Sequence, residues 1–99
     1  MAANALITTD VSIGRHVHVD RAVQIGHDCV LADFVSVYPA AVIAGTVTLG
    51  AGSTVASNAT VIQGLSIGAN AFVGAGAVVI RDVPPATTVA GVPAKPVAS

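Results

Sequence analysis

The chain has 99 residues, of which 54% are apolar and 9% are charged, and its formal net charge is -1. This length allows one domain. The charged share lies far below the roughly 25% usual in soluble domains, so we expect part of the surface to be buried against other subunits. The four lysine and arginine residues form no block, which argues against nucleic-acid binding.

No targeting or membrane segment is predicted. No apolar run approaches the roughly 20 residues of a membrane helix. Residues 1–10 lack the basic start and apolar centre of a signal peptide. The single cysteine, Cys29, has no partner in the chain and fits a reducing compartment. We therefore predict a cytoplasmic protein without membrane contact.

A repeat with a period of six organises the chain from residue 7 to residue 84. Every sixth residue is aliphatic, at Ile7, Ile13, Val19, Ile25, Leu31, Val37, Ile43, Leu49, Val55, Val61, Ile67, Val73 and Val79. The fourth residue after each is mostly small or β-branched, as at Val23, Cys29 and Ala41. A period of six fits short strands separated by turns. Three hexads should close a triangular coil, and coils should stack at about 4.8 Å, the spacing of paired strands.

The repeat predicts the number of coils and where the β-helix ends. Thirteen hexads fill the range 7–84, and at three hexads to a coil they make just over four coils. Glycine follows the aliphatic residue at several turns, for example Gly26, where we expect positive φ. Pro84 and Pro85 cannot donate ladder hydrogen bonds, so the coil should stop there. We predict a β-helix over residues 1–84 and a tail over residues 85–99 that caps the last coil.

Two motifs carry a resemblance to a known family. "GHDC" is followed by "DFV" and a proline, and "GAGAVVIRDVPP" is followed by "VAGVPAKPV". Both resemble the C-terminal β-helix domain of sialic-acid and bacillosamine-type sugar acetyltransferases, which are hexapeptide-repeat acyltransferases. The resemblance implies an all-β, left-handed parallel β-helix and a homotrimer with a CoA cleft where subunits meet. It also implies acetyl transfer from acetyl-CoA to a hydroxyl or amine of a small, sugar-like acceptor.

The resemblance assigns the catalytic residues by position. His27 matches the family's general base, and Asp28 matches the acidic residue that raises its basicity. An imidazole can accept and return a proton near working pH. One coil after His27 comes Gly45, where the missing side chain should leave open space beside the ring. The alternative is that His27 is a solvent-exposed turn histidine and that Asp28 is an ordinary turn residue.

Gly45, at the corner beside His27, is a candidate cofactor contact, and further candidates lie elsewhere along the chain. Ser36 stands where the family often has a second histidine that contacts acetyl-CoA. Gly74 and Gly76 fit a close approach of the pantetheine arm, although coil turns explain them equally well. Lys95, in "GVPAKP", matches basic residues that meet the CoA phosphates in relatives, and we prefer it to Arg81.

Two alternatives concern metal binding and a purely structural role. A metal site is not expected, because the three histidines lie between residues 16 and 27, closer than the ligands of zinc-binding β-helical trimers. His16 and His18 are instead predicted to be turn and face residues. The second alternative is a non-catalytic structural β-helix trimer. It follows from the missing sugar-nucleotide-binding domain, which the family places ahead of this region.

Overall fold

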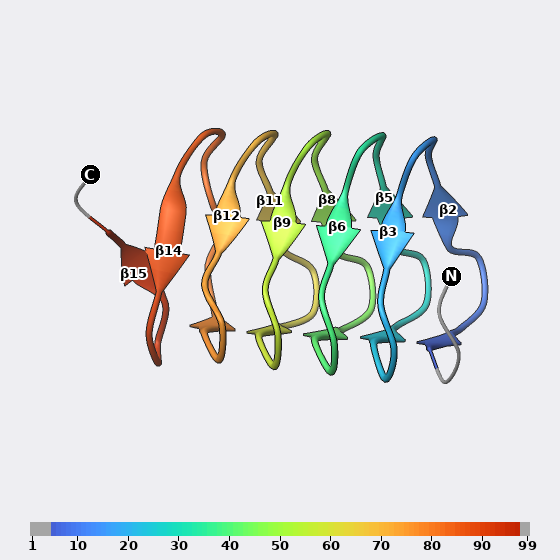
Figure 1. The fold of residues 1–99 in the computed structure, drawn as a ribbon, viewed down its shortest axis with the longest axis horizontal. Helices are drawn as coiled ribbons and strands as arrows, with labels where there is room; N and C mark the ends of the chain where they lie inside the picture. The colour runs from blue at the N-terminus through green and yellow to red at the C-terminus, as the bar shows by residue number, and fades with distance from the viewer. Residues whose placement is uncertain (1–4, 98–99) are drawn as a thin grey trace.

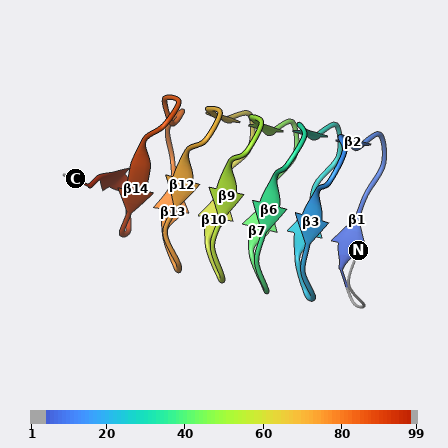
Figure 2. The same ribbon diagram turned by 45° about the horizontal axis from the view of Figure 1, so that its top comes forward.

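The structure, a computed structural model, describes residues 5–97. These residues form three sheets and no helix, so this part of the chain contains no helix able to cross a membrane. Successive strands pass from one sheet to the next, and the coils stack along one axis from the N-terminus to the C-terminus (Figure 1). Figure 2 shows the same stack turned toward the viewer.

Each sheet collects every third strand of the coil. Sheet A contains β1 (Leu6–Ile7), β4 (Gln24–Ile25), β7 (Val42–Ile43), β10 (Thr60–Val61) and β13 (Val78–Val79). Sheet B contains β2 (Ser12–Ile13), β5 (Val30–Leu31), β8 (Thr48–Leu49) and β11 (Ser66–Ile67). Sheet C contains β3 (His18–Val19), β6 (Ser36–Val37), β9 (Thr54–Val55), β12 (Phe72–Val73), β14 (Thr88–Ala90) and β15 (Lys95–Pro96).

The register confirms the predicted hexad. Ile25 pairs with Ile7 on one side and with Ile43 on the other, so equivalent residues in neighbouring coils are three hexads apart. The aliphatic residue of each hexad points inward and is at most 2% exposed from Val19 to Val79. From Val23 to Val83 the small register is also buried, except at the half-buried Leu65, because it fills the narrow space where two sheets meet. In the first coil Ile13 is 40% exposed, since no described coil covers it.

The predicted number of coils is corrected by β14. Sheet A has five strands, and sheet C has five parallel strands before β15, so the chain makes about five coils where the hexad count predicted about four. The coil matches a left-handed parallel β-helix. Val83 forms a bridge with Ile67, and Val89 pairs with Val73. The two residues of each pair are separated by two positions fewer than the three full hexads that separate paired residues elsewhere in the coil. The last coil is therefore two residues shorter than the others, so the six-residue repeat of the sequence stops while the coil itself continues.

Pro84 and Pro85 do not stop the coil. At the equivalent turn of the preceding coil, Gly68 donates its N–H to the carbonyl of Val83 in the coil that follows. No described coil follows Pro84, so its missing N–H leaves no ladder carbonyl unpaired. Beyond the turn, β14 pairs in parallel with β12, and β15 folds back antiparallel on β14. The division into a coil over 1–84 and a capping tail over 85–99 stays an interpretation.

The turns use glycine differently from the prediction. Positive φ occurs at the third residue after the inward aliphatic, often in a non-glycine residue, as at Asp28 (φ 58) and Thr46 (φ 58). Gly26, directly after Ile25, does not have positive φ. A Cβ atom added at Gly26 would lie 2.6 Å from the backbone nitrogen of Gly45. Glycine is required there because two coils approach closely at this corner, and not because of its backbone conformation.

Candidate active site

The His27–Asp28 pair lies on the corner where the chain passes from sheet A to sheet B, here called the A–B corner. This corner comprises the turns after β1, β4, β7, β10 and β13. Asp28 takes the left-handed conformation, and its N–H donates to the carbonyl of Thr9 in the preceding coil at 3.1 Å. The N–H of Thr46 in turn donates to the carbonyl of His27 at 2.8 Å. Backbone hydrogen bonds to the preceding and the following coil therefore hold this turn in place.

The side chains of the pair are in contact. Nδ1 of His27 lies 3.0 Å from Oδ2 of Asp28. Because a carboxylate only accepts hydrogen bonds, this contact places the proton on Nδ1 and leaves the lone pair of the imidazole on Nε2. The two side chains are 59% and 55% exposed, so the pair is open to a ligand in the isolated chain.

Gly45 determines where the imidazole lies. A Cβ atom added at Gly45 would be 2.7 Å from Nε2 of His27 and 3.0 Å from both Cδ2 and Cε1. The space predicted beside the ring is therefore filled by the ring itself. The missing side chain allows the imidazole to occupy this position, with Nε2 as the ring atom nearest to where a Cβ of residue 45 would lie.

The other predicted site residues lie elsewhere on the same chain. Ser36 is on β6 of sheet C, the face opposite the A–B corner, and it pairs across the ladder with His18 and Thr54. Gly74 and Gly76 are in the turn after β12, at the corner between sheets C and A. One chain therefore does not bring these residues to His27.

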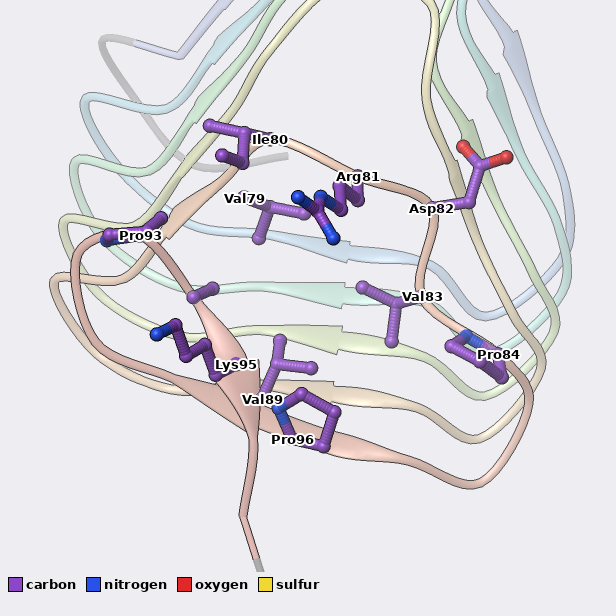
Figure 3. A pocket seen from close by; sticks show the side chains of 11 residues that line it. Val79, Ile80, Arg81, Asp82, Val83, Pro84, Val89, Pro93, Lys95 and Pro96 are labelled. Carbon is purple, nitrogen blue, oxygen red and sulfur yellow. The ribbon is translucent and has the colours of Figure 1, made fainter.

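Lys95 lies on β15 at the C-terminal end. Its side chain forms no ion pair within residues 5–97. It lines a cavity of about 450 Å³ together with Arg81 (Figure 3). This cavity does not include His27 or Asp28. In the isolated chain the cavity and the candidate catalytic pair therefore lie at different places. We base the active-site assignment on the geometry of His27 and Asp28.

A second histidine–aspartate pair was missed in the sequence. Nε2 of His18 lies 3.3 Å from Oδ2 of Asp20, and the His18 and Tyr38 rings are 5.9 Å apart. The backbone N–H of Arg21, followed by the hydrogen bond from His18, holds the pKa of the Asp20 carboxyl below its usual value. The signal in the sequence was a histidine and an aspartate two residues apart, which in a strand places both side chains on one face. No group of three or more potential metal ligands is found in the described chain.

Comparison with known proteins places this geometry in context. No protein-family model matches the chain, and no curated protein sequence matches it. Solved structures do match. A variant of GDP-perosamine N-acetyltransferase from Caulobacter crescentus, in complex with CoA and GDP-perosamine, is 32% identical over 98% of this chain with a TM-score of 0.83. The chain resembles the hexapeptide-repeat sugar acetyltransferases.

Two further structures agree. The acetyltransferase domain of PglB from Neisseria gonorrhoeae, in complex with acetyl coenzyme A, is 29% identical over 96% of this chain with a TM-score of 0.82. A hexapeptide-repeat acetyltransferase from Vibrio cholerae, also complexed with acetyl coenzyme A, is 22% identical over all of this chain with a TM-score of 0.81, and it supports the fold alone. The chain spans 55% of the length of the first two structures and 69% of the third.

Proposed function

We propose that this protein is an acetyltransferase that moves an acetyl group from acetyl-CoA to a hydroxyl or amine of a small, sugar-like acceptor. The observation that carries the proposal is the His27–Asp28 pair, whose Nδ1···Oδ2 distance of 3.0 Å leaves Nε2 free as a base. Resemblance to acetyltransferases that hold CoA or acetyl-CoA supports the choice of cofactor.

The proposed reaction begins at Nε2 of His27. Nε2 takes the proton from the acceptor hydroxyl or amine, and the acceptor atom attacks the thioester carbonyl carbon of acetyl-CoA. The tetrahedral intermediate then collapses, the carbon–sulfur bond breaks, and the thiolate of CoA leaves. The imidazolium returns the proton to that thiolate. Asp28 holds Nδ1–H throughout and stabilises the positive charge that forms on the ring.

The proposed cofactor contacts require more than one chain. Ser36 lies on sheet C, opposite the A–B corner of the same chain, and Gly74 and Gly76 lie on another corner. This distribution supports a site in which one acetyl-CoA contacts His27 of one copy and these residues of another. We propose a homotrimer whose sites lie between neighbouring subunits, with Lys95 meeting the CoA phosphates. The same contact would shield the exposed His27–Asp28 pair from water.

An acetyl-CoA titration tests the cofactor without requiring the acceptor. Calorimetry should show binding to the parent protein and nearly unchanged affinity in His27→Ala, because the base acts on the acceptor. Light scattering at micromolar concentration should give about three times the chain mass of 9.7 kDa. A stable monomer would refute the shared site.

Acceptor screening then tests the chemistry. Thiol release from acetyl-CoA is followed with amino sugars and hydroxyl sugars, and His27→Ala should lower turnover by roughly a hundred- to ten-thousandfold. Turnover within twofold of the parent would eliminate His27 as the base. The second candidate function is a non-catalytic structural β-helix, favoured by Ser36, which stands where the family often has a histidine that contacts acetyl-CoA. Absence of acetyl-CoA binding to a folded trimer would support it.

A further inference from the structure

The His18–Asp20 pair lies beside Ser36, on the face of the chain to which the proposed function assigns acetyl-CoA. His18 on β3 and Ser36 on β6 pair across the parallel ladder, so these outward residues are neighbours about 4.8 Å apart (Figure 1). The imidazole of His18 lies against Asp20 of its own coil, and its centroid is 5.9 Å from that of the Tyr38 ring in the next coil. These contacts hold the ring at the end of sheet C that borders the corner between sheets C and A.

The pair is a second base, in which the other ring nitrogen is free. Nε2 of His18 lies 3.3 Å from Oδ2 of Asp20, so the neutral imidazole carries its proton on Nε2 and its lone pair on Nδ1. Oδ1 of Asp20 accepts the backbone N–H of Arg21 at 2.8 Å, so both carboxylate oxygens are held. The His18 side chain is 57% exposed and makes no other hydrogen bond within residues 5–97. Sheet C therefore presents a base that the reaction at His27 does not use.

Sequence spacing sets the height of these residues along the coil. His27 comes nine residues after His18 and nine residues before Ser36, and paired residues of neighbouring coils are 18 residues apart. His27 is therefore half a coil from each, which is about 2.4 Å along the coil axis. Copies related by a threefold axis parallel to the coil have equivalent residues at the same height. In such a trimer, His18 and Ser36 of one copy lie just below and just above the height of His27 in the next.

Two bases suit an amine acceptor better than a hydroxyl acceptor. An amine is largely protonated at neutral pH, and an ammonium ion has no lone pair with which to attack. It must lose one proton before the attack and a second proton as the carbon–nitrogen bond forms. A hydroxyl group keeps its lone pairs and loses only one proton. The carboxylate of Asp20 also places a negative charge at this face, which attracts an ammonium ion.

We infer that His18 of a neighbouring copy is the second base of the proposed site, and that the acceptor is a primary amine that arrives as an ammonium ion. Nδ1 of His18 takes one proton and leaves the neutral amine. The amine nitrogen attacks the thioester carbon, Nε2 of His27 takes the second proton, and this proton leaves on the CoA thiol. His18 returns the first proton to water, so the ammonium ion and the thioester become an amide, a thiol and a free proton. Asp20 is a positioning residue that acts through His18. This inference rests on the proposed function and names its substrate class.

Cross-linking tests the juxtaposition without any acceptor. A variant that carries both His18→Cys and His27→Cys is treated with a short bis-maleimide and separated on a denaturing gel. Covalent dimers and trimers should form, because the A–B corner and sheet C lie on opposite sides of one chain. The matched control combines His27→Cys with Thr48→Cys, on sheet B, and should form no covalent oligomer. The parent, whose Cys29 is buried, should not react either.

Light scattering separates the two ways in which cross-linking can fail. Absence of covalent oligomers from a variant that is trimeric in solution would overturn the inference and leave the proposed shared site standing. A monomeric parent would refute the shared site, and the inference with it.

Matched acceptors then test the chemistry. Glucosamine and glucose differ in one group, an ammonium ion in place of a hydroxyl, and thiol release from acetyl-CoA measures the turnover of both. The parent should acetylate glucosamine faster than glucose. His18→Ala should lower the turnover of glucosamine by roughly a hundredfold more than that of glucose, since a base typically contributes a factor of this size. Asp20→Asn should change the same ratio by a smaller factor, because it leaves the imidazole in place.

His16→Ala is the matched control for the loss of an exposed imidazole. The His16 ring stacks on Phe34 at another corner, and alanine already takes the same left-handed turn conformation at Ala40. This variant should keep the parent's ratio of glucosamine to glucose turnover. Equal losses for both acceptors in His18→Ala, or faster turnover of glucose by the parent, would overturn the inference. Loss of glucosamine turnover in His27→Ala alone would support acetyl transfer without a second base.

Discussion

Substitution of Gly45 by alanine tests the position of the His27 ring directly. The new Cβ atom would lie 2.7 Å from Nε2, about 0.7 Å inside the 3.4 Å limit of ordinary contact. Its three nearest atoms all belong to the His27 ring, and Gly45 does not have positive φ. The substitution therefore displaces the imidazole without straining the backbone.

The magnitude follows from opposing effects. A compatible glycine-to-alanine change stabilises by about 0.4–1 kcal/mol through the unfolded state. Displacing the ring breaks the exposed His27–Asp28 hydrogen bond, worth at most about 1 kcal/mol at the surface, and forces the side chain from its preferred rotamer at about 0.5–1.5 kcal/mol. We expect Gly45→Ala to be neutral or destabilising by about 1 kcal/mol. Turnover should fall on the order of a hundredfold, as for a misplacement near 1 Å.

A double-mutant cycle isolates the contact. In the His27→Ala background the Cβ of alanine at position 45 meets no ring, so the same change should stabilise by about 0.4–1 kcal/mol. Urea unfolding of the parent and the three variants measures the difference, at one protein concentration because the stability of an oligomer depends on it. Equal effects of Gly45→Ala in both backgrounds, within about 0.3 kcal/mol, would show that the ring does not lie over Gly45.

Three further predictions concern stability. Ile43→Asp should unfold the chain, because Ile43 is 1% exposed and an unpaired buried carboxylate costs several kcal/mol. The matched change Ile62→Asp, at a residue that is 39% exposed, should leave the circular dichroism spectrum unchanged. Equal tolerance of the two changes would refute the inward register. Ser53→Ala should raise the free energy of unfolding by about 1 kcal/mol in denaturant titration, because the Ser53 hydroxyl is buried without a hydrogen-bond partner; a loss of stability would show that the hydroxyl is bonded. Because the pKa of Asp20 is lowered, the carboxylate stabilises the fold fully above pH 3.8, its usual pKa, and this stabilisation is lost as the pH falls through the lower pKa of the folded state. Asp20→Asn should remove this part of the acid dependence of the thermal unfolding temperature. An unchanged pH profile of thermal unfolding in the variant would contradict the prediction.

The sequence by itself determined the repeat and its buried face. A hexad with one aliphatic residue in each strand leaves few other ways to bury those side chains, and Ile25 and Ile43 of this hexad are buried in the structure. The same period placed Gly45 one coil after His27, which is where the structure has it. Spacing carries this information because each coil repeats the geometry of the one before it.

Tertiary structure decided what depends on contacts between coils. The last coil persists because Val83 and Val89 pair with the preceding coil at a spacing two positions short of three hexads, which a strict count of six does not detect. Ser36 and His27 are close in sequence, yet the closure of the triangle places them on opposite sides of one chain. The cavity with Arg81 and Lys95 forms because β15 folds back on β14, and the hexad pattern does not specify that pairing. Periodicity therefore predicts the coil, whereas the ends of the coil and the distribution of site residues over its faces follow from three-dimensional packing.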